Sequence, residues 1–289
     1  MKPQKTLQEQ LPELRPGQSI ELLKELHILT RDGKLNQDTR RKLKQVYHLV
    51  RFIEPLLEGV LKARGDVTLA DHGAGKSYLG FILYDLFFKD KPVGWVTGVE
   101  TRAELVERSQ ALAKRLGFER MRFLATTVQE ALTHPELPAT VDVVTALHAC
   151  DTATDDAIAF GLAKQAQHMV LVPCCQAEVA AVMKRSRALN LARTPLAELW
   201  RHPLHTREFG SQITNVLRCL QLEANGYNVT VTELVGWEHS MKNELILASR
   251  QGSGHRAQQL RAAERLRQVM DELGLDALAT RFGAAAPAG

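Results

Sequence analysis

The chain has 289 residues, of which 45% are hydrophobic and 24% are charged, and its formal net charge is +4. This length is enough for one sizeable core with additional helices, and the mildly basic charge permits an RNA partner without requiring one. No apolar run reaches the roughly 18 residues of a membrane span, and the N-terminus lacks the apolar core of a signal peptide. We therefore expect a cytoplasmic protein without membrane spans.

Two helices are predicted before the first strand. Residues 1–18 are polar and rich in proline, which indicates a flexible leader. A helix follows Ser19, its expected N-cap, with Leu22, Leu23, Leu26 and Leu29 on one face. A second helix begins near Asp38 or Thr39 and carries the apolar stripe Leu43, Val46, Val50, Ile53 and Leu57.

Basic residues gather on another side of that second helix. They are Arg40, Lys44, His48 and Arg51. Such an arc is either an ordinary solvated face or a surface that binds phosphates, and the sequence does not choose between them. As a hypothesis, we assign Arg40, Lys44 and Arg51 to substrate binding.

Residues 67–83 read as a strand, a tight turn and the start of a helix. Gly73 and Gly75 allow positive φ angles and a close approach of a ligand to the backbone, and helix N–H groups attract anions. Gly75-Lys76-Ser77 also forms half of a phosphate-binding P-loop, but Ala70 occupies the position of the first glycine. The third glycine of a dinucleotide-binding motif is absent as well. With both of these motifs incomplete, the turn matches only the shorter pattern D-x-G-x-G, which begins at Asp71.

An acidic residue closes the next predicted strand. Val93–Val99 ends at Glu100, 25 residues beyond Gly75. A carboxylate in this position is suited to accept hydrogen bonds from both ribose hydroxyls. The alternative is a glutamate that is favoured only by the dipole of the helix that follows.

Three more strands and a hairpin complete the predicted sheet. Polar loops beginning at His148 and at Cys174 leave the carboxyl ends of strands, where ligands bind to open α/β sheets. A short link between the last two strands favours an antiparallel pair. Helices are expected at 176–192, 209–223 and 256–273, and strands at 121–125, 141–147, 169–172, 227–235 and 244–249.

Four stretches resemble a known family. They are LHACDTATD (147–155), VPCCQAEV (172–179), the ADHGAGKSYL loop, and WEHSMKN with LILAS near the end. The sequence is similar to an extended family of class I S-adenosylmethionine (SAM) methyltransferases. This family has an uncharacterised bacterial branch, and its distant eukaryotic relatives include a tRNA 2′-O-methyltransferase and methyltransferase-like proteins. The resemblance runs from about Leu22 to Ser249.

This resemblance implies an α/β fold: a Rossmann-like, mostly parallel seven-stranded sheet of order 3-2-1-4-5-7-6, with an N-terminal helical extension and a C-terminal helix. It also implies SAM at Asp71, Gly73 and Gly75, with Glu100 on the ribose. We add Lys76, Thr126 and His148 to the expected cofactor contacts. The chain departs from the family pattern at His72, where an aromatic is usual, and at Ala74, where a cysteine is usual.

Candidate catalytic residues come from the two polar loops. A methyltransferase aligns donor and acceptor and removes a proton where the acceptor needs it. His148, Asp151 and Asp155 are candidates for base or substrate anchor, although His148 could equally be a buried strand-end histidine and Asp155 or Asp156 a helix cap. Cys174 and Cys175 are candidates for a nucleophile, for metal ligands or, as we prefer, for packing.

The resulting hypothesis is a SAM-dependent methyltransferase that acts on RNA, either tRNA or rRNA, without a metal. His239, Lys242 and Asn243 are added as candidate substrate-binding residues. The expected domains are a leader at 1–18, a helical segment at 19–65, a methyltransferase domain at 66–250, and a C-terminal helix and tail at 251–289. The alternatives are a small-molecule or protein substrate, a nucleotide-dependent kinase or ATPase, and a non-catalytic binding module.

Overall fold

The computed structural model describes residue 11 and residues 13–149, 152–173, 177–186, 188, 190–234, 244–252 and 254–283; within these, the side chains of residues 38, 148 and 149 are left out. The chain forms two compact units, Met1–Pro138 and Ala139–Gly289. The expected domain boundaries at 65/66 and 250/251 stay predictions.

One sheet of seven strands has the order β3-β2-β1-β4-β5-β7-β6. β1 pairs in parallel with β2, β2 with β3, and β4 with β5, whereas β7 runs antiparallel to both β5 and β6. The predicted strand order and terminal hairpin are therefore confirmed. The strands are β1 Thr68–His72, β2 Trp95–Glu100, β3 Met121–Ala125, β4 Val143–Ala149, β5 His168–Pro173, β6 Tyr227–Glu233 and β7 Glu244–Arg250.

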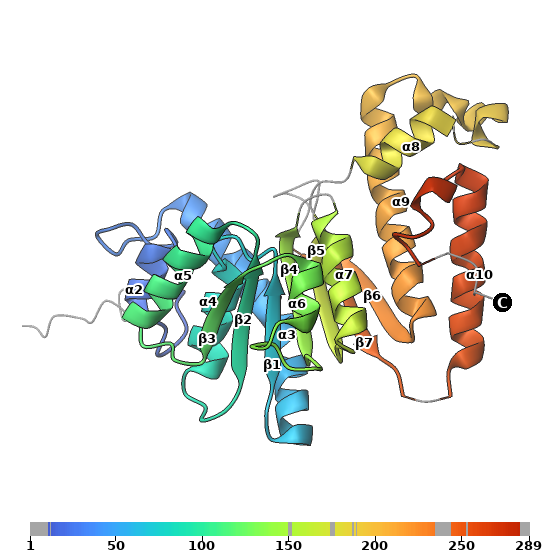
Figure 1. Cartoon of the computed structure of the whole chain (residues 1–289). Helices are drawn as coiled ribbons and strands as arrows, with labels where there is room; N and C mark the ends of the chain where they lie inside the picture. Colours follow the sequence, from blue (N-terminus) through green and yellow to red (C-terminus); the bar gives the residue numbers. More distant parts are fainter. Residues whose placement is uncertain are drawn as a thin grey trace, which may run out of the picture. The chain divides into compact units, whose positions relative to one another are not determined.

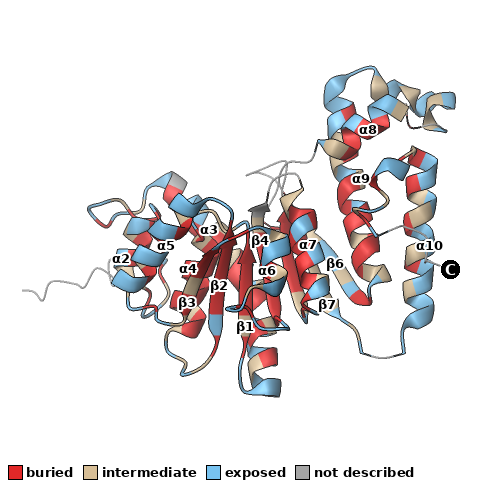
Figure 2. Ribbon diagram, viewed as in Figure 1, coloured by how far each residue is buried: buried red, intermediate tan, exposed pale blue. Residues whose placement is uncertain are grey.

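Strands β1 to β5 are mostly buried, which is why they read as nearly continuous apolar runs, whereas the edge strand β6 is largely exposed (Figure 2). Residues that pair across β1 and β2 fix the register near the glycine turn: Asp71 lies opposite Gly98 and His72 opposite Val99. The last residue of β2, Glu100, pairs with Ala125 at the end of β3. The carboxyl ends of these three strands consequently present their final residues at one edge of the sheet.

The long helix of the first unit is specified at both ends. Asn36 and Thr39 form a capping box at its start, and Gly65 ends it in the left-handed conformation with φ 76°. The predicted stripe is confirmed, since every residue in it is buried. Ser19 caps the preceding helix by accepting a hydrogen bond from the backbone N–H of Leu22, as predicted. The helical elements of this unit are α2 Ile20–Glu25, α3 Gln37–Arg64, α4 Tyr78–Leu83 continued by the π-helix η1 Tyr84–Phe88, α5 Ala103–Arg115 and α6 Val128–Thr133.

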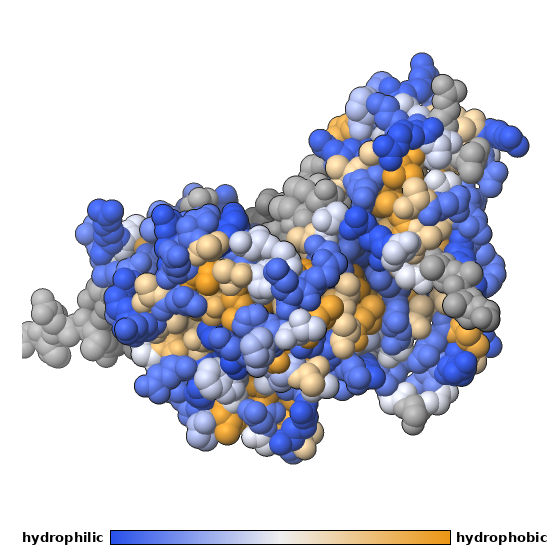
Figure 3. Space-filling model, viewed as in Figure 1, coloured by the Kyte–Doolittle hydropathy of each residue, from blue (hydrophilic) through white to orange (hydrophobic). Residues whose placement is uncertain are grey.

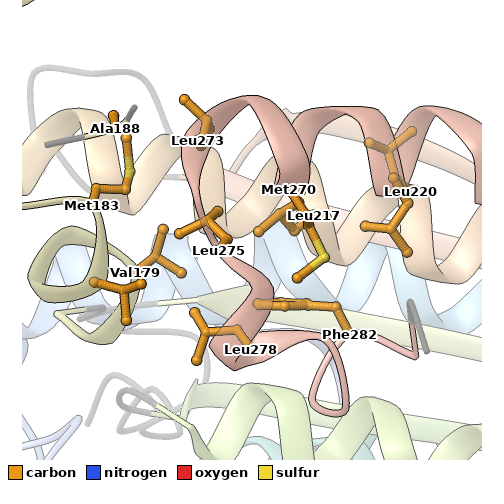
Figure 4. Packing of buried hydrophobic residues seen from close by; sticks show 12 residues of the cluster. Val179, Met183, Ala188, Leu217, Leu220, Met270, Leu273, Leu275, Leu278 and Phe282 are labelled. Carbon is orange, nitrogen blue, oxygen red and sulfur yellow. The ribbon is translucent and has the colours of Figure 1, made fainter. Parts of the chain in front are cut away.

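In the second unit, α8 and α10 pack against the long helix α9, and Figure 1 shows α9 and α10 side by side. Their facing side chains, among them Met183, Leu217 and Met270, form an apolar cluster that Phe282 joins from beyond η5 (Figure 4). The expected helix at 176–192 was too long, because α8 ends at Ser186 and 3-10 turns follow. The helical elements are α7 Ala153–Ala163, α8 Glu178–Ser186, η2 Leu191–Arg193, η3 Pro195–Trp200, α9 Pro203–Ala224, α10 Arg256–Leu273 and η5 Asp276–Leu278.

Candidate functional site

The glycine turn after β1 has the predicted strand–turn–helix form. Gly73 and Gly75 have φ angles of 61° and 56°, in the left-handed region that favours glycine. The N–H of Ala74 donates to the carbonyl of Val99 at 3.1 Å, which ties the turn to the neighbouring strand β2. The backbone of this turn is thereby held beside the end of β2.

Asp71 lies buried beneath this turn. Its Oδ2 accepts a hydrogen bond from Ser77 Oγ at 3.2 Å, and Ser77 itself has a φ of 49°. A Cβ placed on Gly80 would lie 2.5 Å from Ser77 Oγ and 3.4 Å from Asp71 Oδ2, so the absence of a side chain at Gly80 makes room for this contact. In the structure, Asp71 therefore supports the turn from below, while its direct contact with a cofactor stays a prediction.

Glu100, the last residue of β2, accepts hydrogen bonds from both the glycine turn and Arg102. Its carboxylate accepts hydrogen bonds from Gly75 N at 2.8 Å, from Arg102 N at 3.1 Å and from Arg102 Nε at 2.9 Å. Burial raises the pKa of Glu100, but the hydrogen bonds from Arg102 and Gly75 outweigh it and hold the pKa below its usual value. The group is therefore an anion at neutral pH, as a hydrogen-bond acceptor for ribose hydroxyls needs to be.

Sequence reasoning missed Arg102, the partner of Glu100. Its guanidinium makes a second bond, from Nη2 to Glu100 Oε2 at 3.2 Å, and its side chain is 60% exposed. Because a long exposed side chain moves at little cost, Arg102 can yield one carboxylate oxygen to another donor. A cation two residues after a strand-ending glutamate was the signal that could have revealed it.

Two other residues that were expected to contact the cofactor are Thr126, which lies next to Glu100, and Lys76, which lies on the turn. The backbone N–H of Thr126 donates to the carbonyl oxygen of Glu100 at 3.1 Å, and Thr126 Oγ1 donates to Glu130. Lys76 is exposed, and it makes no ion pair with any residue that the structure describes. Burial lowers the pKa of His72, at the end of β1, to about 4, so this imidazole is neutral.

The candidate catalytic residues are described only in part. His148 belongs to β4, but its side chain lies outside the described residues, as do Asp151, Cys174 and Cys175. The one described cysteine, Cys219, is a free thiol whose pKa is raised to about 12, chiefly by burial. The roles proposed for the other cysteines stay predictions.

Asp155 is held by a buried arginine that the sequence reasoning did not single out. Arg218 on α9 donates to both carboxylate oxygens, from Nε at 2.7 Å and from Nη2 at 2.9 Å, and its side chain is fully buried. Arg218 Nη1 also donates to Asn215 Oδ1, and Asn215 Nδ2 donates to Glu244. An arginine within the apolar run VLRCLQL was the available signal.

This geometry corrects the alternative that Asp155 or Asp156 is a helix cap. The N-cap of α7 is Thr152, and both aspartates lie in the first turn of the helix. The bidentate bond of Asp155 with Arg218 makes its carboxylate a link between α7 and α9.

The candidate substrate residues on α3 are exposed but not equivalent. Arg40 forms an ion pair with Glu13 at 3.0 Å, whereas Lys44 and Arg51 make no ion pair within the described part of the chain. His48 is only half-exposed and meets the ring of Phe52 edge-on, which corrects the expectation of four cations displayed together. His239, Lys242 and Asn243 lie outside the described residues.

The described residues contain neither a metal-binding cluster nor a membrane-spanning helix. No group of three or more His, Cys, Asp or Glu side chains there has a metal-binding arrangement. No helix in the same part of the chain is long and apolar enough to cross a bilayer.

The strand order with an antiparallel seventh strand is that of class I methyltransferases. Residues 41–182 match the model of a family described as "Methyltransferase domain". The matched stretch begins within α3 and ends within α8. Among curated proteins, none matches this sequence significantly.

Several solved structures are similar at low identity. Magnesium protoporphyrin IX methyltransferase from Synechocystis PCC 6803, with bound S-adenosylhomocysteine, is 14% identical over 80% of this chain and 93% of its own (TM-score 0.43). Precorrin-6y C5,15-methyltransferase from Geobacter metallireducens is 16% identical over 64% and 80% (TM-score 0.37). A fibrillarin pre-rRNA processing protein from Methanococcus jannaschii is 13% identical over 65% and 68% (TM-score 0.41). At these TM-scores, the similarities add nothing to what the strand order shows.

Proposed function

We propose that this protein is a SAM-dependent methyltransferase whose substrate is RNA, either tRNA or rRNA. The observation that carries the cofactor assignment is the contact of the ionised Glu100 carboxylate with the backbone of the glycine turn, at 2.8 Å from Gly75 N. A hydrogen-bonding carboxylate beside a turn that leaves room for a ligand supports a ribose-binding role for Glu100. The match of residues 41–182 to a methyltransferase domain supports the same cofactor.

The residues of the turn fit such a cofactor. A Cβ added at Gly75 would meet only Arg102 Nη2 at 3.8 Å and a backbone oxygen at 4.0 Å, so the backbone here is open apart from the exposed guanidinium. Glu100 would hold the ribose hydroxyls once Arg102 has released one carboxylate oxygen. SAM supplies an activated methyl group on its sulfonium, and the protein aligns the acceptor with it.

The P-loop alternative is disfavoured by the acids on both sides of the turn. The hydroxyl of Ser77, which would bind magnesium in a P-loop, donates instead to the buried Asp71 at 3.2 Å. The ionised Glu100 lies on the other side, where it would repel a triphosphate. These carboxylates suit a cationic, hydroxyl-rich ligand better than a polyphosphate.

RNA as the substrate class is supported by the exposed basic face of α3 in the first unit. Lys44 and Arg51 are exposed and have no acidic partner among the described residues. Each is free to neutralise a phosphate. Incubating the protein with SAM carrying a labelled methyl group, together with purified tRNA, rRNA, protein and small-molecule fractions, tests this part. Label confined to the protein or small-molecule fraction would contradict it.

The cofactor assignment is tested by calorimetry with SAM, S-adenosylhomocysteine and ATP. We expect SAM to bind and the Glu100→Gln variant to bind it about tenfold or more weakly, because hydrogen bonds to a charged acceptor contribute roughly 1.5–3 kcal/mol. Glu104→Gln, an exposed acid in the first turn of α5, is the matched control and should bind like the wild type. Binding of ATP without SAM, in folded protein, would reject the proposal.

A further inference from the structure

The positive charge of this chain is concentrated in two helical segments, one in each unit. Helix α3 carries seven Lys or Arg residues and three acids, a formal charge of +4. Residues 184–208, here called the basic helical segment, carry six Lys or Arg residues and two glutamates, also +4. Since the whole chain is +4, the rest of it has a formal charge of −4.

The cations of the basic helical segment face solvent. Those that the structure describes are exposed: Lys184, Arg185, Arg193, Arg201 and Arg207. The two glutamates neutralise only two of these, through the pairs Arg201–Glu198 at 2.9 Å and Arg207–Glu208 at 3.3 Å. Lys184, Arg185 and Arg193 have no acidic partner in the part of the chain that the structure describes. Three cations are thus available for an external anion.

A packed scaffold holds these cations in place. The apolar side of α8, formed by Val179, Val182 and Met183, is buried against α9 and α10 (Figure 4). A Cβ placed on Gly210 of α9 would lie 2.5 Å from the Cβ of Ala180, so the two helices approach each other at backbone distance. Lys184 and Arg185 therefore lie on a packed helix rather than on a tail, and Leu191, in the same 3-10 turn as Arg193, packs against the same cluster.

The surroundings favour a phosphate chain over a membrane or an acidic protein. Because the apolar face of α8 is used internally, it cannot insert into a lipid bilayer. The start of α9 has no acid in its first turn, so the helix dipole adds to the local positive field. Exposed Leu196 and Leu204 lie among the cations and offer apolar contacts to unpaired bases. Figure 3 shows small apolar areas scattered among hydrophilic ones on this side of the second unit.

We propose that the basic helical segment, on α8, the 3-10 turns and the start of α9, is an RNA-binding surface that holds the phosphate backbone. This inference rests on the proposed function, because the bound RNA would be the methylation substrate. Binding of RNA to the surface is nevertheless tested without SAM. A folded surface with three unpaired cations would bind RNA in a salt-dependent manner.

The test measures the affinity of the protein for a purified tRNA fraction and for poly(U) at salt concentrations from about 0.05 to about 0.3 M. We expect Lys184→Glu/Arg185→Glu/Arg193→Glu to bind RNA about 100-fold more weakly near 0.1 M salt. The dependence of log affinity on log salt should flatten by about 2, since each lost contact removes roughly 0.7 of slope. The control is Lys114→Glu/Arg256→Glu/Arg261→Glu, which changes the net charge by the same amount at exposed cations outside the basic helical segment.

Several results would overturn this inference. One is that the wild type does not bind RNA, and another is that the variant and the control lose RNA affinity equally. A third is that the wild type binds polyglutamate or phosphatidylserine vesicles as tightly as it binds RNA. Calorimetry with SAM on the same proteins separates the two proposals. Normal SAM binding with unchanged RNA affinity in the variant rejects the surface alone, whereas lost SAM binding in the wild type rejects the methyltransferase alone.

Discussion

Asp155 illustrates how one acid can be read in two ways. By its place after β4, it is a candidate base or substrate anchor. In the structure, both of its oxygens are bound by Arg218, whose side chain is completely buried. A buried carboxylate with a bidentate guanidinium is better suited to position α7, and with it the end of β4, than to accept a proton from a substrate.

This interpretation makes a testable prediction about the pair. Asp155→Ala should lower the free energy of unfolding by about 3–5 kcal/mol, because it leaves the charge of Arg218 buried without its partner. Asp155→Leu/Arg218→Met, in which an apolar pair replaces the ion pair, should recover most of that stability in urea unfolding and retain methyl transfer. A double variant that is stable and inactive would instead give Asp155 a chemical role.

The sequence indicated where in the fold a residue lies when this follows from its position along the chain. Asp71, Gly75 and Glu100 could be placed because a strand end and a glycine turn are local features. Arg102 and Arg218 were not identified, because their importance depends on which carboxylate their guanidinium groups reach. For Arg218 that carboxylate is 63 residues away, and no local pattern encodes this contact.

Helix periodicity was a good guide for α3 and for α10, whose predicted bounds of 256–273 are confirmed, and a poor one in the stretch between α8 and α9. The stripe of α3 was predicted because its apolar residues recur at one spacing. Residues 184–202 gave a helical pattern at their start, but η2 and η3 interrupt it, with Pro195 at the start of η3. The start of α9 at Pro203 was missed because its first turns are polar.

The close approach of α8 and α9 is a property of these two elements that substitution can test. Gly210→Ala should destabilise the protein by about 1–3 kcal/mol, since the added Cβ would lie 2.5–2.8 Å from Ala180 atoms, two of them in the backbone. Gly59→Ala is the matched control: Gly59 also lies within a helix, and a Cβ there meets nothing within 4 Å. It should stabilise by about 0.5–1 kcal/mol. Urea denaturation measures both, and opposite signs are expected; a neutral Gly210→Ala would contradict the packing described.

At the scale of the whole chain, the strand order could be predicted. In a sequence of alternating strands and helices, the parallel or antiparallel direction of each strand and the length of each connection leave few possible orders of strands in the sheet. The distribution of charge could be predicted only in part. The basic arc of α3 was visible as a helical face, whereas the basic helical segment spans four elements whose boundaries the sequence did not reveal. Its cations lie on elements that are held together by the packing of α8 and η3 against α9.

The last prediction concerns both basic segments together. They belong to different units and share no ion pair among the described residues, so their contributions to RNA affinity should add in log units. Lys44→Glu/Arg51→Glu should flatten the salt dependence by about 1.4, the triple variant of the basic helical segment by about 2, and the combined variant by about 3.5. Filter binding across a salt series measures all three slopes. A combined variant no weaker than the triple variant would show that α3 takes no part in holding RNA, and its basic face would then be a solvated surface of the first unit.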